Sequence, residues 1–273
     1  MALREPRVVA AGHGLQWARE GLELFAASPV VWIGITILFL MMGVVLSIIP
    51  FAGMLWSVVV PIHVGGLMLG CRALRQGQPL EVRHLFNGFE APRVQPLALV
   101  GALYLAGSLI VMLPLIALVV MGMLGSAFVL GAANGNTASL VGVLLVGGVI
   151  TLVVLAGILV LSLSLWFAPA LVVFDGAQAL DALKASLRAG WMNVGAFTVY
   201  GVVMIGVGLI AAAPLMASIL LTVARGDQAG ALAIVTIGGS ALFTLLCMFL
   251  LMPTTWASMY TSYEDVFGDR TQV

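Results

Sequence analysis

The chain has 273 residues, of which 62% are apolar and only 8% carry a charge. A soluble domain averages roughly 45–50% apolar and about 25% charged residues. Eleven basic and eleven acidic side chains are too few to coat a soluble protein of this length, so the composition predicts an integral membrane protein and excludes a soluble enzyme or a disordered scaffold. Because the net charge is zero, the chain offers no basic face, and we expect no nucleic-acid partner.

Four long uncharged stretches define the membrane-spanning segments. A spanning helix needs about 20 apolar residues, so residues 24–71 and 94–174 each have room for two spans, while 189–224 and 228–263 have room for one each. Turn residues divide the two longer stretches, the second of them at the Gly- and Asn-rich segment 131–137. The predicted spans are residues 30–49, 54–74, 97–129, 140–168, 194–223 and 230–255.

The basic residues give the orientation of these spans. If both termini are cytoplasmic, all of the eleven Lys and Arg residues except Arg225 fall on the cytoplasmic side. Such an asymmetry is typical of the positive-inside distribution of multi-pass membrane proteins. We therefore expect an all-α integral membrane protein, with residues 1–273 forming a single membrane domain and with the N- and C-termini in the cytoplasm.

Three of the predicted cytoplasmic segments are amphipathic when drawn as helices: residues 8–25, 82–89 and 180–188. Their apolar side chains recur at three- and four-residue steps, with charged and amide side chains between them. We expect these segments to be interfacial helices, with the apolar stripes among the lipid headgroups. The stripes are Val8, Ala11, Leu15, Ala18, Leu22 and Phe25; Val82, Leu85, Phe86 and Phe89; and Leu180, Leu183 and Leu187.

Each amphipathic segment leads into a span and then to a proline at a similar distance, namely Pro50, Pro114 or Pro214. This spacing predicts a threefold repeat of an interfacial helix followed by a helical hairpin. The alternative is that any six-span protein with short outer loops shows a similar spacing between its amphipathic segments and its prolines.

Tryptophan side chains lie close to the predicted span ends, which is typical of an aromatic belt at the membrane interface. We expect them to anchor the helices in the interface. The residues are Trp17, Trp32, Trp56, Trp166, Trp191 and Trp256.

His63 is the titratable side chain of note inside a predicted span, where it follows Pro61 by two residues. Apart from Arg72 near the end of the second span, the predicted spans contain no Asp, Glu, Lys or Arg. Intramembrane ionisable groups are the first place to look for function. In a structural role, a neutral imidazole would bond to the backbone carbonyl freed by Pro61 or to a hydroxyl on another helix. In a functional role, His63 would be a ligand or proton site. We expect no catalytic, cofactor-binding or metal-binding set, and hence no enzymatic activity and no cofactor.

Four arginines, Arg72, Arg75, Arg83 and Arg93, lie in a short stretch beside the membrane. They could contact anionic lipid headgroups, at about 1 kcal/mol each. The alternative is that these arginines only determine the membrane orientation of the spans.

Three short motifs carry a family resemblance. They are Gly12–Trp17 near the N-terminus, Gly77–Pro79 leading to Leu85–Phe89, and Ser262–Gly268 after the last span. The arrangement resembles an uncharacterised family of bacterial inner-membrane proteins, the BPSS1780-type membrane proteins. Its Ser-Tyr-x-Asp-x-Phe ending is also similar to the membrane domains associated with some glycerophosphodiesterases. The resemblance implies six spans and a location in the bacterial inner membrane, and it implies no activity.

These features favour a non-enzymatic accessory protein of the membrane or envelope that interacts with membrane lipids. The alternative is a transporter or channel for a neutral or lipid-like solute, which repeated hairpins and proline-broken spans would suit. An intramembrane enzyme ranks last, because no nucleophile–base set can be assembled within the spans. The sequence leaves open whether a second copy of the chain or another membrane protein is a partner.

Overall fold

The computed structural model describes residues 4–49, 51–124, 131, 133–225 and 230–268. Six of the helices in these residues are long and apolar enough to cross a membrane, which confirms the prediction of an all-α integral membrane protein. The helices are α1 (His13–Ala27), α2 (Pro29–Ile48), α3 (Ala52–Arg75), the 3-10 helix η1 (Val82–Phe89), α4 (Val94–Leu124), α6 (Thr137–Trp166), α7 (Ala168–Asp175), α8 (Ala179–Met192), α9 (Val194–Arg225) and α10 (Gly230–Phe267).

The predicted spans correspond to α2, α3, α4, α6, α9 and α10, and most helix ends lie within a few residues of the prediction. The predicted end of the third span, at residue 129, lies outside the described residues. The large difference is in α10, which has 38 residues and continues well beyond the predicted end at residue 255. At 1.5 Å per residue this helix is about 57 Å long, much longer than the roughly 30 Å hydrocarbon core of a bilayer.

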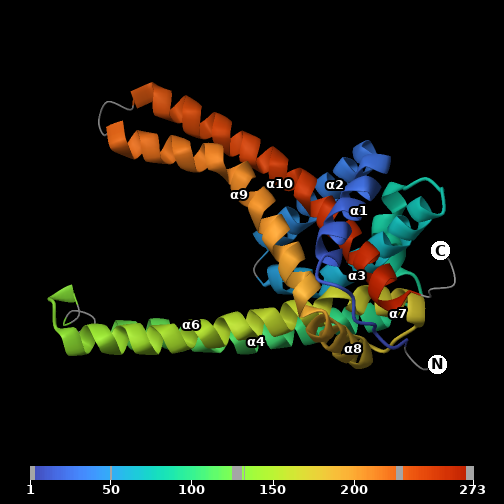
Figure 1. The fold of residues 1–273 in the computed structure, drawn as a ribbon, viewed down its shortest axis with the longest axis horizontal. Coiled ribbons are helices and arrows are strands. Elements are labelled where there is room, and N and C mark those ends of the chain that lie inside the picture. The colour runs from blue at the N-terminus through green and yellow to red at the C-terminus, as the bar shows by residue number, and fades with distance from the viewer. Residues whose placement is uncertain (1–3, 50, 125–130, 132, 226–229, 269–273) are drawn as a thin grey trace.

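The long helices form three consecutive hairpins, α2–α3, α4–α6 and α9–α10, each preceded by a short helix, which is α1, η1 or α8. The short helices, α7 and the last turns of α10 gather into a compact part of the molecule, which we call the hub (Figure 1). Hairpins α4–α6 and α9–α10 extend from the hub in diverging directions (Figure 1). Their outer halves expose large aliphatic side chains, such as Leu144, Leu152 and Ile210. A lipid environment would cover these surfaces.

Two of the three prolines do not mark hairpin turns. Pro114 lies inside α4 and Pro214 inside α9, whereas Pro50 lies outside the described residues. A proline within a helix removes one backbone hydrogen bond and causes a kink, and α9 bends partway along its length (Figure 1). The turn between α4 and α6 instead uses Gly135 at a φ of 80° and Asn136, whose side chain caps the start of α6.

The short helices pack on the protein through small residues. In α1, the buried face contains Gly14, Ala18 and Gly21, and a Cβ on Gly14 would overlap the carbonyl oxygen of Ala196 in α9. In α8, the buried residues are likewise small: Ala179, Ala182, Ser186, Ala189 and Gly190. The aliphatic residues Leu15, Leu22 and Leu180 of the predicted stripes stay exposed. Apart from Ala18, the small residues on which α1 and α8 dock lie outside the predicted apolar stripes.

The expected aromatic belt is wrong for three of the six tryptophans. Trp17, Trp32 and Trp256 are buried in the protein, at 1%, 0% and 6% exposure. Trp191 on α8, by contrast, is exposed. Buried indoles need a partner for their N–H groups, and that of Trp32 donates to the carbonyl of Leu24 at 3.1 Å.

Candidate functional site

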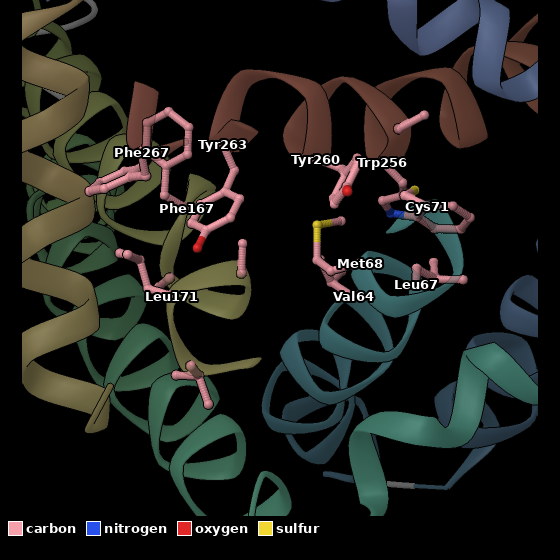
Figure 2. Close-up of a cluster of buried hydrophobic side chains, with 14 of the residues drawn as sticks. Val64, Leu67, Met68, Cys71, Phe167, Leu171, Trp256, Tyr260, Tyr263 and Phe267 are labelled. Atoms are coloured by element: carbon pink, nitrogen blue, oxygen red, sulfur yellow. The ribbon is translucent and has the colours of Figure 1, made fainter. Parts of the chain in front are cut away.

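The last turns of α10 lie at the centre of the hub. Figure 2 shows α10 lying across α3 and α7, with Tyr260 pointing toward Met68 of α3. Farther along α10, Phe267 contacts Phe167 edge-on, with ring centroids 5.4 Å apart, and stacks on Tyr263 at 5.6 Å. The apolar side of this helix end thus joins elements that are far apart in the sequence.

Three carboxylates near this helix end share one pattern, in which each forms an ion pair with an arginine and accepts a hydrogen bond from a Trp or Tyr side chain. The first is Asp265, whose Oδ1 is 2.8 Å from a guanidinium nitrogen of Arg7. Its Oδ2 accepts from the indole N–H of Trp17 at 2.8 Å and lies 2.7 Å from Nδ1 of His13. Asp265 therefore ties the N-terminal segment and α1 to the end of the last helix.

The second carboxylate is Asp175 at the end of α7. It lies 3.1 Å from Nε of Arg4 and accepts from the Tyr263 hydroxyl at 2.8 Å. The third is Glu264, which pairs with Arg75 of α3 at 3.2 Å and accepts from the Tyr260 hydroxyl at 2.6 Å. Charge-assisted bonds of this kind are stronger than neutral ones. The hub is thus a network of satisfied charges between α3, α7 and α10.

The N-terminal segment is held in addition by Asn193, at the junction of α8 and α9. Its side-chain oxygen accepts from the backbone N–H of Val9 at 2.8 Å. Its amide nitrogen donates to the carbonyls of Arg7 and Ala189, both at 2.9 Å. Because both the oxygen and the nitrogen of this buried amide are hydrogen-bonded, Asn193 holds the N-terminal segment in one position.

The four arginines expected to contact lipid have separate partners in the structure. Arg75 also pairs with Glu20 of α1, so it holds α1, α3 and α10 together. The guanidinium of Arg72 lies over the ring of Phe174, 5.3 Å from its centroid. Arg83 pairs with Glu81 at 2.8 Å, and Arg93 with Glu90 at 3.5 Å. Their contact with anionic lipid remains a prediction, and for Arg75 the ion pairs already supply a structural role.

Helix η1 lies along the inner turns of α3. A Cβ on Gly88 would overlap the carbonyl of Ile62, and a Cβ on Gly66 would overlap that of His84. The two backbones therefore approach closely through glycine, as small residues allow in membrane proteins. This contact places Phe86 and Phe89, each 40% exposed, beside the middle of α3.

His63 lies under this contact. Its side chain is 2% exposed, and its Nδ1 lies 2.9 Å from the carbonyl oxygen of Leu85 in η1. The partner is thus a backbone carbonyl of another element, and neither the carbonyl freed by Pro61 nor a Ser or Thr hydroxyl. Four aromatic rings surround the imidazole, with centroids 5.1 to 5.8 Å away: those of Phe39, Trp56, Phe86 and Phe89.

His63 lines a pocket of about 430 Å³ between α2, α3 and η1, which we call the His63 pocket. Apart from the imidazole its walls are aliphatic, aromatic or thioether side chains, and Met41 and Val45 of α2 lie at its exposed edge. Ligand pockets are typically about 300–1,000 Å³, apolar, and supplied with a few polar groups. The complete lining is Leu38, Met41, Met42, Val45, Leu46, Trp56, Val59, His63, Phe86 and Phe89.

A pattern in the sequence could have indicated part of this arrangement. The predicted stripe of η1 includes Phe86 and Phe89, and an aromatic pair beside an intramembrane histidine favours a shared pocket. Nothing in the local pattern indicates that Asp265, Asp175 and Glu264 meet Arg7, Arg4 and Arg75, because these pairs are distant in the sequence. Within the described residues, no three His, Cys, Asp or Glu side chains are grouped as metal ligands.

The chain is similar to a probable inner membrane protein of Burkholderia thailandensis, with 28% identity over 95% of this chain and 93% of the relative. No family model and no solved structure matches the chain. The similarity and the six membrane-length apolar helices together identify a multi-pass protein of the bacterial inner membrane.

Proposed function

We propose that this protein is a non-enzymatic accessory protein of the inner membrane that holds a lipid molecule in the His63 pocket. The observation that carries the proposal is the pocket itself, a mainly apolar space between α2, α3 and η1. Its exposed edge, formed by Met41 and Val45, is on the apolar surface that lipid chains would cover. The partners are therefore membrane lipids.

The hub supports a non-enzymatic role. Asp175, Glu264 and Asp265 each already bind an arginine and an aromatic donor, so their charge is used within the fold. Carboxylates engaged in this way suit the joining of helices better than proton transfer to a substrate.

A transporter is less well supported. The His63 pocket belongs to α2, α3 and η1, and a second pocket, of about 520 Å³, lies between α9 and α10. Alternating access is usually built around a site at the interface between repeats. The second pocket lies within one hairpin. The His63 pocket lies between the first hairpin and η1, but its lining is almost entirely apolar, which suits the holding of lipid better than the passage of a solute.

Membership of the BPSS1780-type family is part of the same proposal. The motif Gly12–Trp17 begins at α1, and the motif Ser262–Gly268 ends α10. The two motifs contact each other through Trp17 and Asp265. A shared structural role in the hub would explain why both appear in one chain.

Native mass spectrometry of the protein released gently from membranes tests the lipid proposal. The Val45→Trp change places a large side chain at the edge of the pocket, whereas Val44→Trp places it on the neighbouring exposed position outside the lining. We expect the wild type and Val44→Trp to retain a lipid molecule that Val45→Trp loses. Equal retention by the two variants would refute the proposal.

A further inference from the structure

The two nitrogens of His63 have different surroundings. Nδ1 lies 2.9 Å from the carbonyl oxygen of Leu85, and a carbonyl can only accept, so Nδ1 carries a hydrogen and donates. Nε2 has no hydrogen-bond partner among the described side chains and backbone groups. Since Nδ1 donates to η1, Nε2 is the ring nitrogen left for a ligand in the pocket that His63 lines.

The neutral imidazole fits these surroundings. No carboxylate within the described residues forms an ion pair with His63, and aromatic and aliphatic side chains enclose the ring. Burying an unpaired charge in such surroundings is very costly. With the hydrogen on Nδ1, Nε2 carries a lone pair and is a hydrogen-bond acceptor. The pocket therefore offers one acceptor, and the indole N–H of Trp56 is the only other polar side-chain group among the lining residues.

The depth of His63 restricts what can bind there. It lies about 13 Å along the axis of α3 from Arg72, at 1.5 Å per residue. Arg72 belongs to the basic end of this helix, and a phosphate or other charged headgroup would remain near that end. A group that reaches His63 must be uncharged, and it must supply a hydrogen to Nε2.

We propose that the His63 pocket binds a neutral lipid with a free hydroxyl group, whose O–H donates to Nε2 of His63. The acyl chains lie in the pocket toward Val45 and Trp56. The lining of Leu38, Met41, Met42, Val45 and Leu46 on α2 suits flexible chains. This inference rests on the proposed function and names the chemistry of its ligand.

The experiment compares dioleoylglycerol with its 3-O-methyl ether, which has the same chains and no O–H. Both are supplied at equal mole fraction in phosphatidylcholine nanodiscs, and native mass spectrometry measures their binding to the full chain. We expect the wild type to prefer dioleoylglycerol by about fivefold, since a net hydrogen bond is worth about 1 kcal/mol. Equal binding of alcohol and ether by the wild type overturns the inference.

Two variants assign the preference to the correct nitrogen. In His63→Asn, the amide nitrogen replaces Nδ1 and can still donate to Leu85, but no acceptor replaces Nε2. In His63→Gln, the longer amide can place its oxygen near the position of Nε2. We expect the preference for dioleoylglycerol to disappear in His63→Asn and to persist in His63→Gln. An unchanged preference in His63→Asn overturns the inference.

The two proposals can fail separately. If the wild type binds alcohol and ether equally, while Val45→Trp loses both and Val44→Trp keeps both, lipid binding stands and the hydroxyl inference fails. If Val45→Trp and Val44→Trp bind the two lipids alike, the pocket itself is not the binding site and both proposals fail.

Discussion

The indole N–H of Trp17 donates to the carboxylate of Asp265 across a distance of 2.8 Å. Trp17 belongs to the helix before the first span, and Asp265 lies near the end of the helix that contains the last. The same carboxylate also binds Arg7 and His13. One aspartate therefore joins the beginning of the described chain to its end, and the three hairpins extend from the hub that it helps to form.

Asp265→Asn is expected to lower the free energy of unfolding by about 3 kcal/mol. The change removes the charge that pairs with Arg7 and replaces one acceptor oxygen of the carboxylate with a donor group. Loss of one partner of a partly buried, hydrogen-bonded ion pair is costly. The measurement is the midpoint of thermal unfolding in detergent micelles. The matched control is Glu23→Gln, which breaks the exposed Arg19–Glu23 pair on α1 and should cost less than about 1 kcal/mol. Similar losses in both variants would contradict a central role for Asp265.

Gly21→Val is expected to detach α1 from α10. A Cβ on Gly21 would lie 2.7 Å from the backbone oxygen of Thr254 and would also overlap the side chain of Ser258. Overpacking of this kind costs about 1–3 kcal/mol, so the unfolding midpoint should fall. Gly34→Val on α2 is the control, since it meets open space in the structure. If the two variants unfold alike, α1 does not dock through Gly21.

The six spans could be predicted because each leaves a local signal, a long uncharged run that a bilayer requires. The hub could not be predicted in this way. Leu15 and Leu22 form a good apolar stripe, yet α1 packs through Gly14 and Gly21, because close approach of two helix backbones depends on small residues rather than on hydrophobicity. The pairing of Asp265 with Arg7 depends on tertiary structure alone. His63 was found because a polar residue in an apolar run is visible in sequence, whereas its partner Leu85 was not.

Ser186→Ala is expected to destabilise the junction between α6 and α7. The buried Ser186 hydroxyl of α8 accepts from the backbone N–H of Phe167 at 2.9 Å and donates to the carbonyl of Leu163 at 2.6 Å. Leaving both groups unpaired should cost about 1–3 kcal/mol. Hydrogen exchange at the Phe167 amide should become faster. Ser164→Ala, which removes only an exposed bond to Val160 within α6, should leave that exchange rate unchanged.

Cysteine labelling in intact cells tests the orientation. Asn134 lies in the turn between α4 and α6, and Gln78 is exposed between α3 and η1. In a background in which Cys71 and Cys247 are replaced by alanine, a membrane-impermeant maleimide should react with the Asn134→Cys variant in intact cells. The Gln78→Cys variant should react only after the cells are disrupted, because the basic residues place that connection in the cytoplasm. The opposite pattern of labelling would reverse the orientation, and Arg225 would then be the single basic residue left in the cytoplasm.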